Sequence, residues 1–172
     1  MKALLIFLSF ILISCEMRSQ RDYTNTVDEF TGNRISMSDD LCTWYPGEAD
    51  ICTRFYFVEG RSFLTITYEA NDWVFAETLL LKNRSSGEIY SYEGNYNTWT
   101  REVGNGGFVL EQMAVEIDQE LFNFIKSCLG SEVVARFIGK DKIIDIELDK
   151  IGNDPDLHQW AAFVEKYESI NL

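Results

Sequence analysis

The strongest constraint on the fold is a series of short segments in which apolar and polar residues alternate, each followed by a turn signal. Leu64, Ile66 and Tyr68, for example, alternate with polar residues. A period of two places the apolar side chains on one face of a β-strand. Strands joined by short turns are expected to be antiparallel neighbours. The expected strands are 35–38, 51–57, 64–69, 73–81, 88–92, 98–103, 108–117, 133–138 and 143–148.

Two segments in the last third of the chain have a helical period. Asp118 is a suitable N-cap for a helix over 119–129, and Gly130 is expected to end it. Pro155 opens a final helix with an apolar stripe. A sheet must bury one face, so the helices are expected to cover it. The sequence therefore predicts a single α+β domain over 29–172, with an antiparallel sheet of about seven or eight strands and two C-terminal helices packed on one face.

The charge balance limits the class of partner. Acidic residues outnumber basic residues 28 to 15, which gives a formal net charge of −13. Binding to nucleic acid requires a basic face, so this balance argues against a nucleic-acid partner. It also disfavours electrostatic docking on anionic lipid. A net negative charge of this size favours association with a basic protein.

The N-terminus begins like a secretory signal peptide. Lys2 is followed by an apolar run over 3–13, which is well below the ~20 residues that span a bilayer. The run ends in Leu12-Ile13-Ser14-Cys15, which resembles the lipobox of bacterial lipoproteins. An ordinary secretory signal and an uncleaved anchor are the alternatives.

The lipobox resemblance implies a lipid-anchored protein of the cell envelope. It implies removal of residues 1–14 as a signal peptide and attachment of diacylglycerol, with acyl chains such as palmitate, to the thiol of Cys15. The polar stretch 15–28 is then expected to be a lipidated tether that attaches the domain to the membrane. In enterobacterial lipoproteins, aspartate directly after the lipidated cysteine is the signal for retention in the inner membrane. Glu16 at this position therefore favours sorting to the outer membrane.

Three further cysteines follow the lipobox. The turn signal Pro46-Gly47 lies between Cys42 and Cys52, and extracytoplasmic space permits disulfides, so these two are expected to be bridged. Closing so short a loop stabilises the fold by roughly 3 kcal/mol in the chain-entropy model. Cys128 falls on the apolar face of the first helix and is expected to be a buried thiol. A bridge that involves Cys128, or no bridge, are the alternatives.

Residues suited to catalysis or metal binding form no specific motif. His158, the single histidine, has no identifiable nucleophile beside it, so a surface or half-buried position is expected. The oxygen-rich run 149–156 lacks the residue order of a calcium-binding loop. No catalytic residue, metal ion or cofactor is therefore predicted. Neighbouring carboxylates arise by chance in so acidic a chain, the pairs being Asp39/Asp40, Glu48/Asp50 and Glu69/Asp72.

Aromatic residues gather in two segments, 44–57 and 90–99, and the loops 43–51 and 90–99 are the candidate contact sites. Packing in the core is the usual role of aromatic residues in strands. The second segment, however, mixes tyrosine and tryptophan with serine, asparagine and glycine, a composition typical of recognition surfaces. The candidate partner-binding residues are Trp44, Tyr45, Tyr92, Tyr96 and Trp99.

The domain resembles small uncharacterised exported proteins and lipoproteins of bacteria. The resemblance rests on Glu111 in a strand before a helix, on Arg136-Phe137-x-Gly139 after it, and on Asp72-Trp73-Val74-Phe75 entering a central strand. It implies no particular activity. The preferred hypothesis is a non-catalytic envelope lipoprotein that binds another macromolecule, for example as an inhibitor or immunity protein. The alternative is a carboxylate-based hydrolase, which requires two carboxyl groups about 5 to 10 Å apart in a cleft, with raised pKa.

Overall fold

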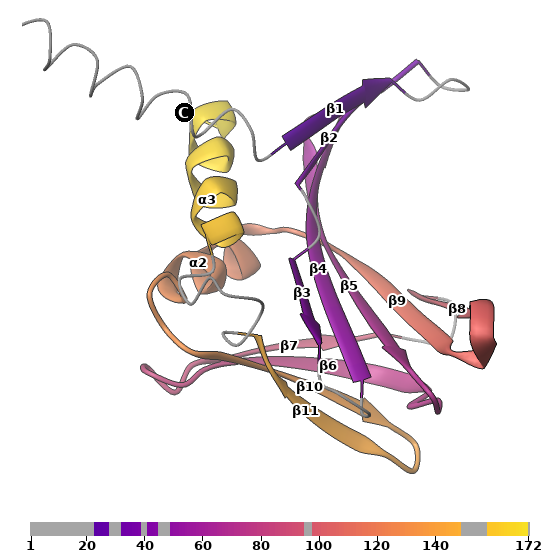
Figure 1. Cartoon of the computed structure of the whole chain (residues 1–172). Helices are drawn as coiled ribbons and strands as arrows, with labels where there is room; N and C mark the ends of the chain where they lie inside the picture. The colour runs from indigo at the N-terminus through magenta and orange to yellow at the C-terminus, as the bar shows by residue number, and fades with distance from the viewer. Residues whose placement is uncertain are drawn as a thin grey trace, which may run out of the picture.

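The described part of the chain forms two antiparallel β-sheets and two α-helices, which confirms the predicted α+β class (Figure 1). The strands are divided between two sheets, however, instead of forming one sheet. The computed structural model describes residues 23–27, 32–38, 41–44, 49–94, 98–148 and 158–171.

The larger sheet has seven strands in the order β1-β2-β4-β5-β9-β8, and β3 also pairs with β4. The smaller sheet has four strands in the order β11-β10-β6-β7. The strands of the larger sheet are β1 (Tyr23–Val27), β2 (Arg34–Ser38), β3 (Leu41–Trp44), β4 (Ala49–Val58), β5 (Arg61–Ala70), β8 (Trp99–Val103) and β9 (Val109–Glu116). Those of the smaller sheet are β6 (Ala76–Asn83), β7 (Ile89–Glu93), β10 (Val133–Gly139) and β11 (Ile143–Glu147).

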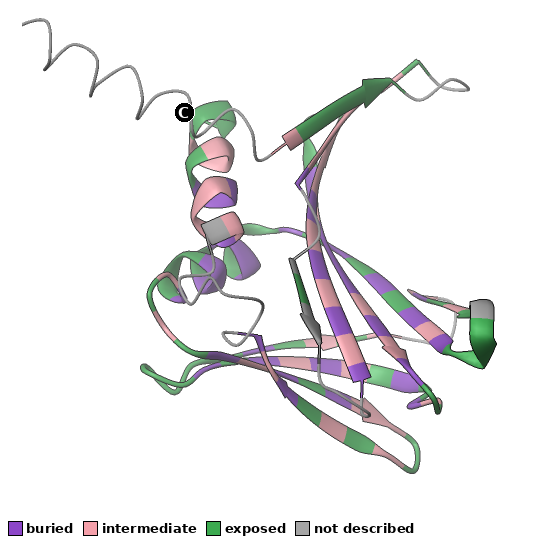
Figure 2. Ribbon diagram, in the orientation of Figure 1, coloured by how far each residue is buried: buried purple, intermediate pink, exposed green. Residues whose placement is uncertain are grey.

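The alternating sequence pattern explains which face of each sheet is buried. In β4, Ile51 and Phe55 are inaccessible to solvent, and in β5 Leu64 and Ile66 are equally buried. Cys52 and Arg54 of β4 and Thr67 of β5, on the opposite face, are only partly buried, so buried and intermediate bands follow one another along much of these strands (Figure 2). The buried faces of the two sheets are turned toward a common core.

The two helices, which contact each other, complete this core. Asp118 caps α2 (Gln119–Ser127) by accepting a hydrogen bond of 2.8 Å from the backbone of Leu121, as the sequence predicts. Helix α2 meets the smaller sheet, where Phe124 lies 6.0 Å from Tyr90. The last helix, α3 (His158–Asn171), meets the larger sheet. The helices are therefore not both packed on one face of one sheet.

Helix α3 is joined to the larger sheet by a cluster of aromatic rings. Phe163 stacks on Phe55 of β4, with ring centroids 4.2 Å apart and an interplanar angle of 11°. Trp160 meets the same ring edge-on at 6.0 Å, and Phe122 of α2 lies 6.4 Å from Phe163. Phe163 thus connects both helices to the sheet.

The structure differs from the predicted elements in three main respects. Residues 23–27 form β1, which pairs with β2, so this part of the expected tether belongs to the sheet. Strand β3 was not predicted. Strand β6 begins at Ala76, because Phe75 has a positive φ of 52° that no β-strand adopts. Neither described helix has both the length and the apolar character that crossing a membrane requires.

Candidate functional site

The predicted disulfide is present between Cys42 and Cys52. These residues lie directly opposite each other in the pairing of β3 with β4, and their Cα atoms are 4.0 Å apart. The bridge therefore fixes the short strand β3 to the sheet. Cys128 is a free and buried thiol, and burial raises its pKa to about 12, which keeps it protonated and unreactive.

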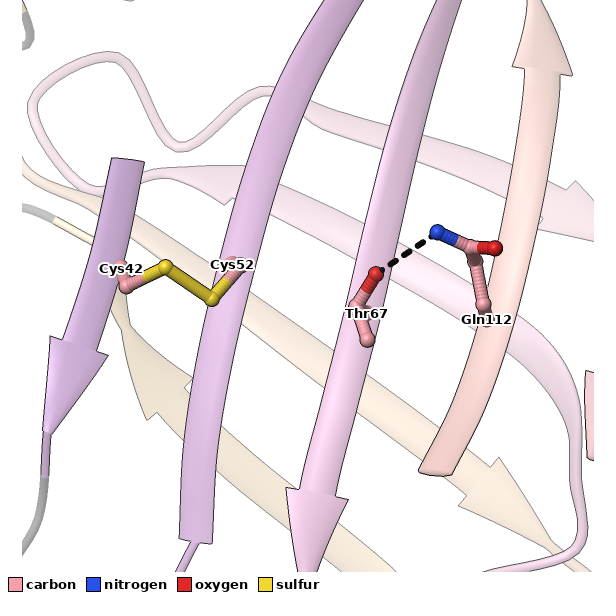
Figure 3. Close-up of a disulfide and its surroundings, with 4 residues drawn as sticks. All are labelled: Cys42, Cys52, Thr67 and Gln112. Carbon is pink, nitrogen blue, oxygen red and sulfur yellow. Dashed lines mark hydrogen bonds between the residues drawn. A yellow bond between two sulfur atoms is a disulfide. The ribbon is translucent and has the colours of Figure 1, made fainter. Parts of the chain in front are cut away.

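The disulfide lies in line with a row of polar side chains on the larger sheet (Figure 3). Cys52 pairs with Thr67, and Thr67 pairs with Gln112. The amide of Gln112 donates a hydrogen bond of 3.0 Å to the hydroxyl of Thr67. Directly opposite residues point to the same face of a sheet, so this face, which is turned away from the core, is polar.

The predicted aromatic contact residues have different positions. Trp99 is 4% exposed and packs against Phe137, so it is a core residue and not part of a recognition surface. The pairing of Trp99 with the buried Met113 of β9 explains this burial, because both side chains point inward. Tyr92 is partly buried and packs against the core. Trp44 belongs to β3, and its side chain lies outside the described part of the chain, as do Cys15, Tyr45 and Tyr96.

A buried carboxylate, Glu111 of β9, forms the most unusual polar arrangement in the described residues. Its side chain is fully inaccessible to solvent. One oxygen accepts hydrogen bonds from the backbone N–H groups of Val74 and Phe75, at 2.6 and 2.9 Å, and the other accepts one from Ala76 at 2.9 Å. Three successive N–H groups around one anion form a concave binding site for negative charge. Glu111 therefore holds the segment that leads into β6.

Arg101 of β8 completes this arrangement, which we call the carboxylate clamp. Its Nε lies 3.4 Å from Glu111, and its guanidinium donates a hydrogen bond of 2.8 Å to the carbonyl of Ala76. Beneath the segment, the hydroxyl of Tyr68 donates to the carbonyl of Asp72 at 3.3 Å. Burial, together with the charge of Glu111, raises the pKa of Tyr68 to about 12, so this donor keeps its proton.

The clamp holds an aromatic pair on the outside of the molecule. Phe75 is 50% exposed and has left-handed backbone geometry, which costs about 1–3 kcal/mol for such a residue. Its ring stacks on Trp73, with centroids 5.5 Å apart, and Arg101 lies 5.9 Å from the same ring. We call Trp73 and Phe75 the aromatic ledge. Strained residues kept in place by their surroundings are common where proteins bind ligands.

Gly139 of β10 allows the backbone to approach the clamp. A Cβ atom at this position would lie 1.9 Å from the carbonyl oxygen of Val74, so only glycine fits without a shift of the backbone. The turn 140–142, which follows Gly139, also contacts the segment that carries the ledge. The ammonium of Lys142 lies 3.3 Å from the carboxylate of Asp72, the residue before Trp73. Glu111, residues 72–75 and Gly139 thus meet at one place.

Three turns meet at this end of the molecule, which we call the turn end: 71–75, 104–108 and 140–142. Ala70 pairs with Val109, which places the first two turns beside each other. Four of the seven large apolar side chains that are exposed in the described residues lie here, namely Phe75, Val103, Phe108 and Ile143. The exposed carboxylates at this end are Asp72, Glu77, Glu102 and Asp141, of which Asp72 is paired with Lys142, and Lys140 is an exposed base.

The two carboxylates that line one of the described cavities are each bound by an arginine. A cavity of about 560 Å³ contains Asp145 and Glu147. Asp145 is bound by Arg136 at 2.6 Å, and this hydrogen bond holds the pKa of Asp145 below its usual value. Glu147 is bound by Arg84 at 2.6 Å. A general acid needs a raised pKa. Within the ranges that the structure describes, no three potential metal ligands lie together.

The sequence places Glu111 in an expected strand but does not by itself indicate its role. The alternation of β9 puts it on the same face as Val109, Met113 and Val115, which are all buried. A carboxylate on the core face of a strand must have hydrogen-bonding partners, and this is the signal that could have identified the clamp.

Comparison of the chain with protein families, with curated proteins and with solved structures finds no match.

Proposed function

We propose that the protein is a non-catalytic lipoprotein of the cell envelope that binds a basic protein through the aromatic ledge at its turn end. An inhibitor or immunity protein is one form of this function. The observation that carries the proposal is the exposed, left-handed Phe75, stacked on Trp73 and held by the buried Glu111. An aromatic side chain that is rigid before binding loses little entropy when a partner covers it.

The surroundings of the ledge suit a protein partner with positive charge. Apolar side chains at the centre of an interface, with polar groups around them, are the usual anatomy of a protein–protein contact. At the turn end, Phe75 and Phe108 are exposed, and the exposed carboxylates of Glu77, Glu102 and Asp141 belong to the same end of the molecule. The net charge of −13 adds long-range attraction for a basic protein.

Two features support a location in the envelope. The disulfide between Cys42 and Cys52 is of the kind that persists in oxidising compartments. The lipobox-like sequence that ends in Cys15 supports attachment to the membrane by lipid. Lipidation and partner binding are separate parts of the proposal, and each has its own test.

The binding part is tested with the full-length protein, tagged after Leu172 and used as bait in envelope extracts. Phe75→Ala is expected to reduce recovery of the partner by about tenfold or more, because a central aromatic contact contributes about 2 kcal/mol or more. Ile89→Ala is the matched control, since Ile89 is 56% exposed on β7, away from the turn end. Equal recovery of the partner by wild type and Phe75→Ala would show that the ledge is not part of the interface.

The anchoring part is tested by membrane fractionation. Cys15→Ala is expected to abolish incorporation of labelled fatty acid and to move the protein out of the lipid-anchored fraction, because the thiol that carries the lipid is missing. Cys128→Ala serves as the control for loss of a cysteine, since Cys128 is a free thiol inside the domain. Unchanged labelling and fractionation of Cys15→Ala would refute the lipoprotein assignment and leave the binding part standing.

A further inference from the structure

A groove of about 800 Å³ lies at the other end of the larger sheet from the turn end. It is formed by β1 and β2, by the turn between β4 and β5, and by the last turns of α3. In Figure 1 these elements occupy the upper part of the molecule, whereas the turn between β8 and β9 lies at the lower right. The size is that of a site for a small ligand.

Lys166 of α3 places its ammonium group in this groove. The group donates a hydrogen bond to the hydroxyl of Ser36 on β2. It also lies 3.8 Å from the centre of the Tyr23 ring and 4.9 Å from that of Phe57. Partial burial lowers the pKa of Lys166, since few charged or polar groups replace its water shell. An ammonium group has three N–H donors, and Ser36 accepts only one of them.

Lys166 differs from most basic residues of the domain in the kind of partner that its side chain has. Arg61, Arg84, Arg101, Lys126, Arg136 and Lys142 each have a carboxylate within 4 Å in the structure. For Lys166, by contrast, the structure records a hydroxyl and two rings as partners, in the ranges that it describes. A partly buried cation without a counter-ion is costly, and an incoming anion would lower that cost.

The rest of the groove has one further cation and an apolar part. Arg34 of β2 also lines it, and Glu59 is the one carboxylate among its lining residues in the described chain. Val27 and Ile170, which are 55% and 51% exposed, lie on β1 and on α3. They are two of the three large exposed apolar side chains that are not at the turn end. Positive and apolar surfaces therefore meet in one groove of an otherwise acidic protein.

We propose that this groove binds an anionic amphiphile, with its carboxylate or phosphate head at Lys166 and Arg34 and its aliphatic chain against Val27 and Ile170. The head supplies a counter-ion that no described residue provides, and two N–H donors of Lys166 remain to bind it. The chain covers apolar surface that is otherwise in contact with water. Such a site is independent of the ledge and of the partner proposed for it.

The test measures the chemical reactivity of individual lysines. Full-length protein in nanodiscs of zwitterionic lipid is treated with an amine-modifying reagent, and modification is measured by peptide mass spectrometry. Decanoate and decyl phosphate serve as the anions, below the concentrations at which they form micelles. At ten times its dissociation constant, a bound anion is expected to slow modification of Lys166 about tenfold, because only the free fraction reacts. Lys140, which is exposed at the turn end, is expected to be unaffected.

An uncharged amphiphile with the same tail, decyl maltoside, separates charge from apolar contact. Protection of Lys166 by either anion, but not by decyl maltoside, supports the proposal and shows which head group is preferred. Equal protection by all three compounds, or protection by none, would overturn it.

Two variants provide an independent measurement in the same nanodiscs. Lys166→Met keeps the length of the side chain and removes its charge, and is expected to weaken binding of the preferred anion about tenfold or more by calorimetry. Lys140→Met is the matched control and is expected to bind like wild type. Equal affinity in the two variants would contradict the role of Lys166, whereas the labelling of wild-type protein does not depend on how well either variant folds.

Discussion

Glu111→Ala is expected to lower the free energy of unfolding by about 3–5 kcal/mol, as measured by urea denaturation followed through tryptophan fluorescence. The substitution leaves three backbone N–H groups, those of Val74, Phe75 and Ala76, without their acceptor, and it removes one carboxylate partner of Arg101. Buried donors that lose their partner are not compensated by water. The left-handed backbone of Phe75 also loses its hydrogen bond to Glu111. The substitution is therefore expected to lower the stability of the fold and to loosen the position of the ledge.

Glu116→Ala is the matched control for this substitution. Glu116 lies on the same strand, β9, and is paired with Arg61, but its side chain is 51% exposed. An exposed ion pair contributes little to stability, so this variant is expected to unfold close to wild type. Similar losses for Glu111→Ala and Glu116→Ala would show that the clamp is not a special source of stability.

Phe163→Ala is expected to cost about 3–5 kcal/mol in the free energy of unfolding, the range measured when a buried phenylalanine is truncated. Phe163 is fully buried, and its ring contacts Phe55 and Phe57 of β4, Phe122 of α2, and Tyr167. Loss of this ring leaves a cavity where the two helices and the larger sheet meet. The same denaturation experiment measures the effect.

Phe108→Ala tests whether this loss comes from burial. Phe108 is 41% exposed at the turn end, so its truncation is expected to change the unfolding free energy by about 0.5 kcal/mol or less. If Phe163→Ala behaves like Phe108→Ala, the aromatic cluster is not what holds α3 to the sheet.

The sequence predicts the individual elements of this fold better than their arrangement. Alternation identifies β5 and β9, and the cap at Asp118 identifies α2, because these signals are local. The rule that short turns join neighbouring strands holds for the β4–β5, β6–β7, β8–β9 and β10–β11 hairpins. It fails between β5 and β6 and between β7 and β8, where the chain passes from one sheet to the other. That passage depends on distant contacts, such as those of Glu111 with residues 74–76.

The same distinction applies to the candidate site. Pairing of Cys42 with Cys52 follows from a short loop and a turn signal, so it is predictable. Composition placed Trp99 on a recognition surface, but composition does not record which face of a strand a residue occupies, and register with Met113 buries it. The exposure of Phe75 is likewise absent from the local pattern, because the expected strand 73–81 made it an ordinary strand residue, and only the clamp turns it outward.

The contact between the two ends of the described chain has a consequence for how the protein is made. Lys166 of α3 binds Ser36 of β2 across 130 positions, and Phe163 covers Phe55 of β4. During synthesis, which proceeds from the N-terminus, the concave side of the larger sheet stays uncovered until the final helix has been delivered. Contacts between such distant segments form slowly, and partly folded chains with apolar surface aggregate. The larger sheet therefore completes its core only after residues 158–171 have been synthesised.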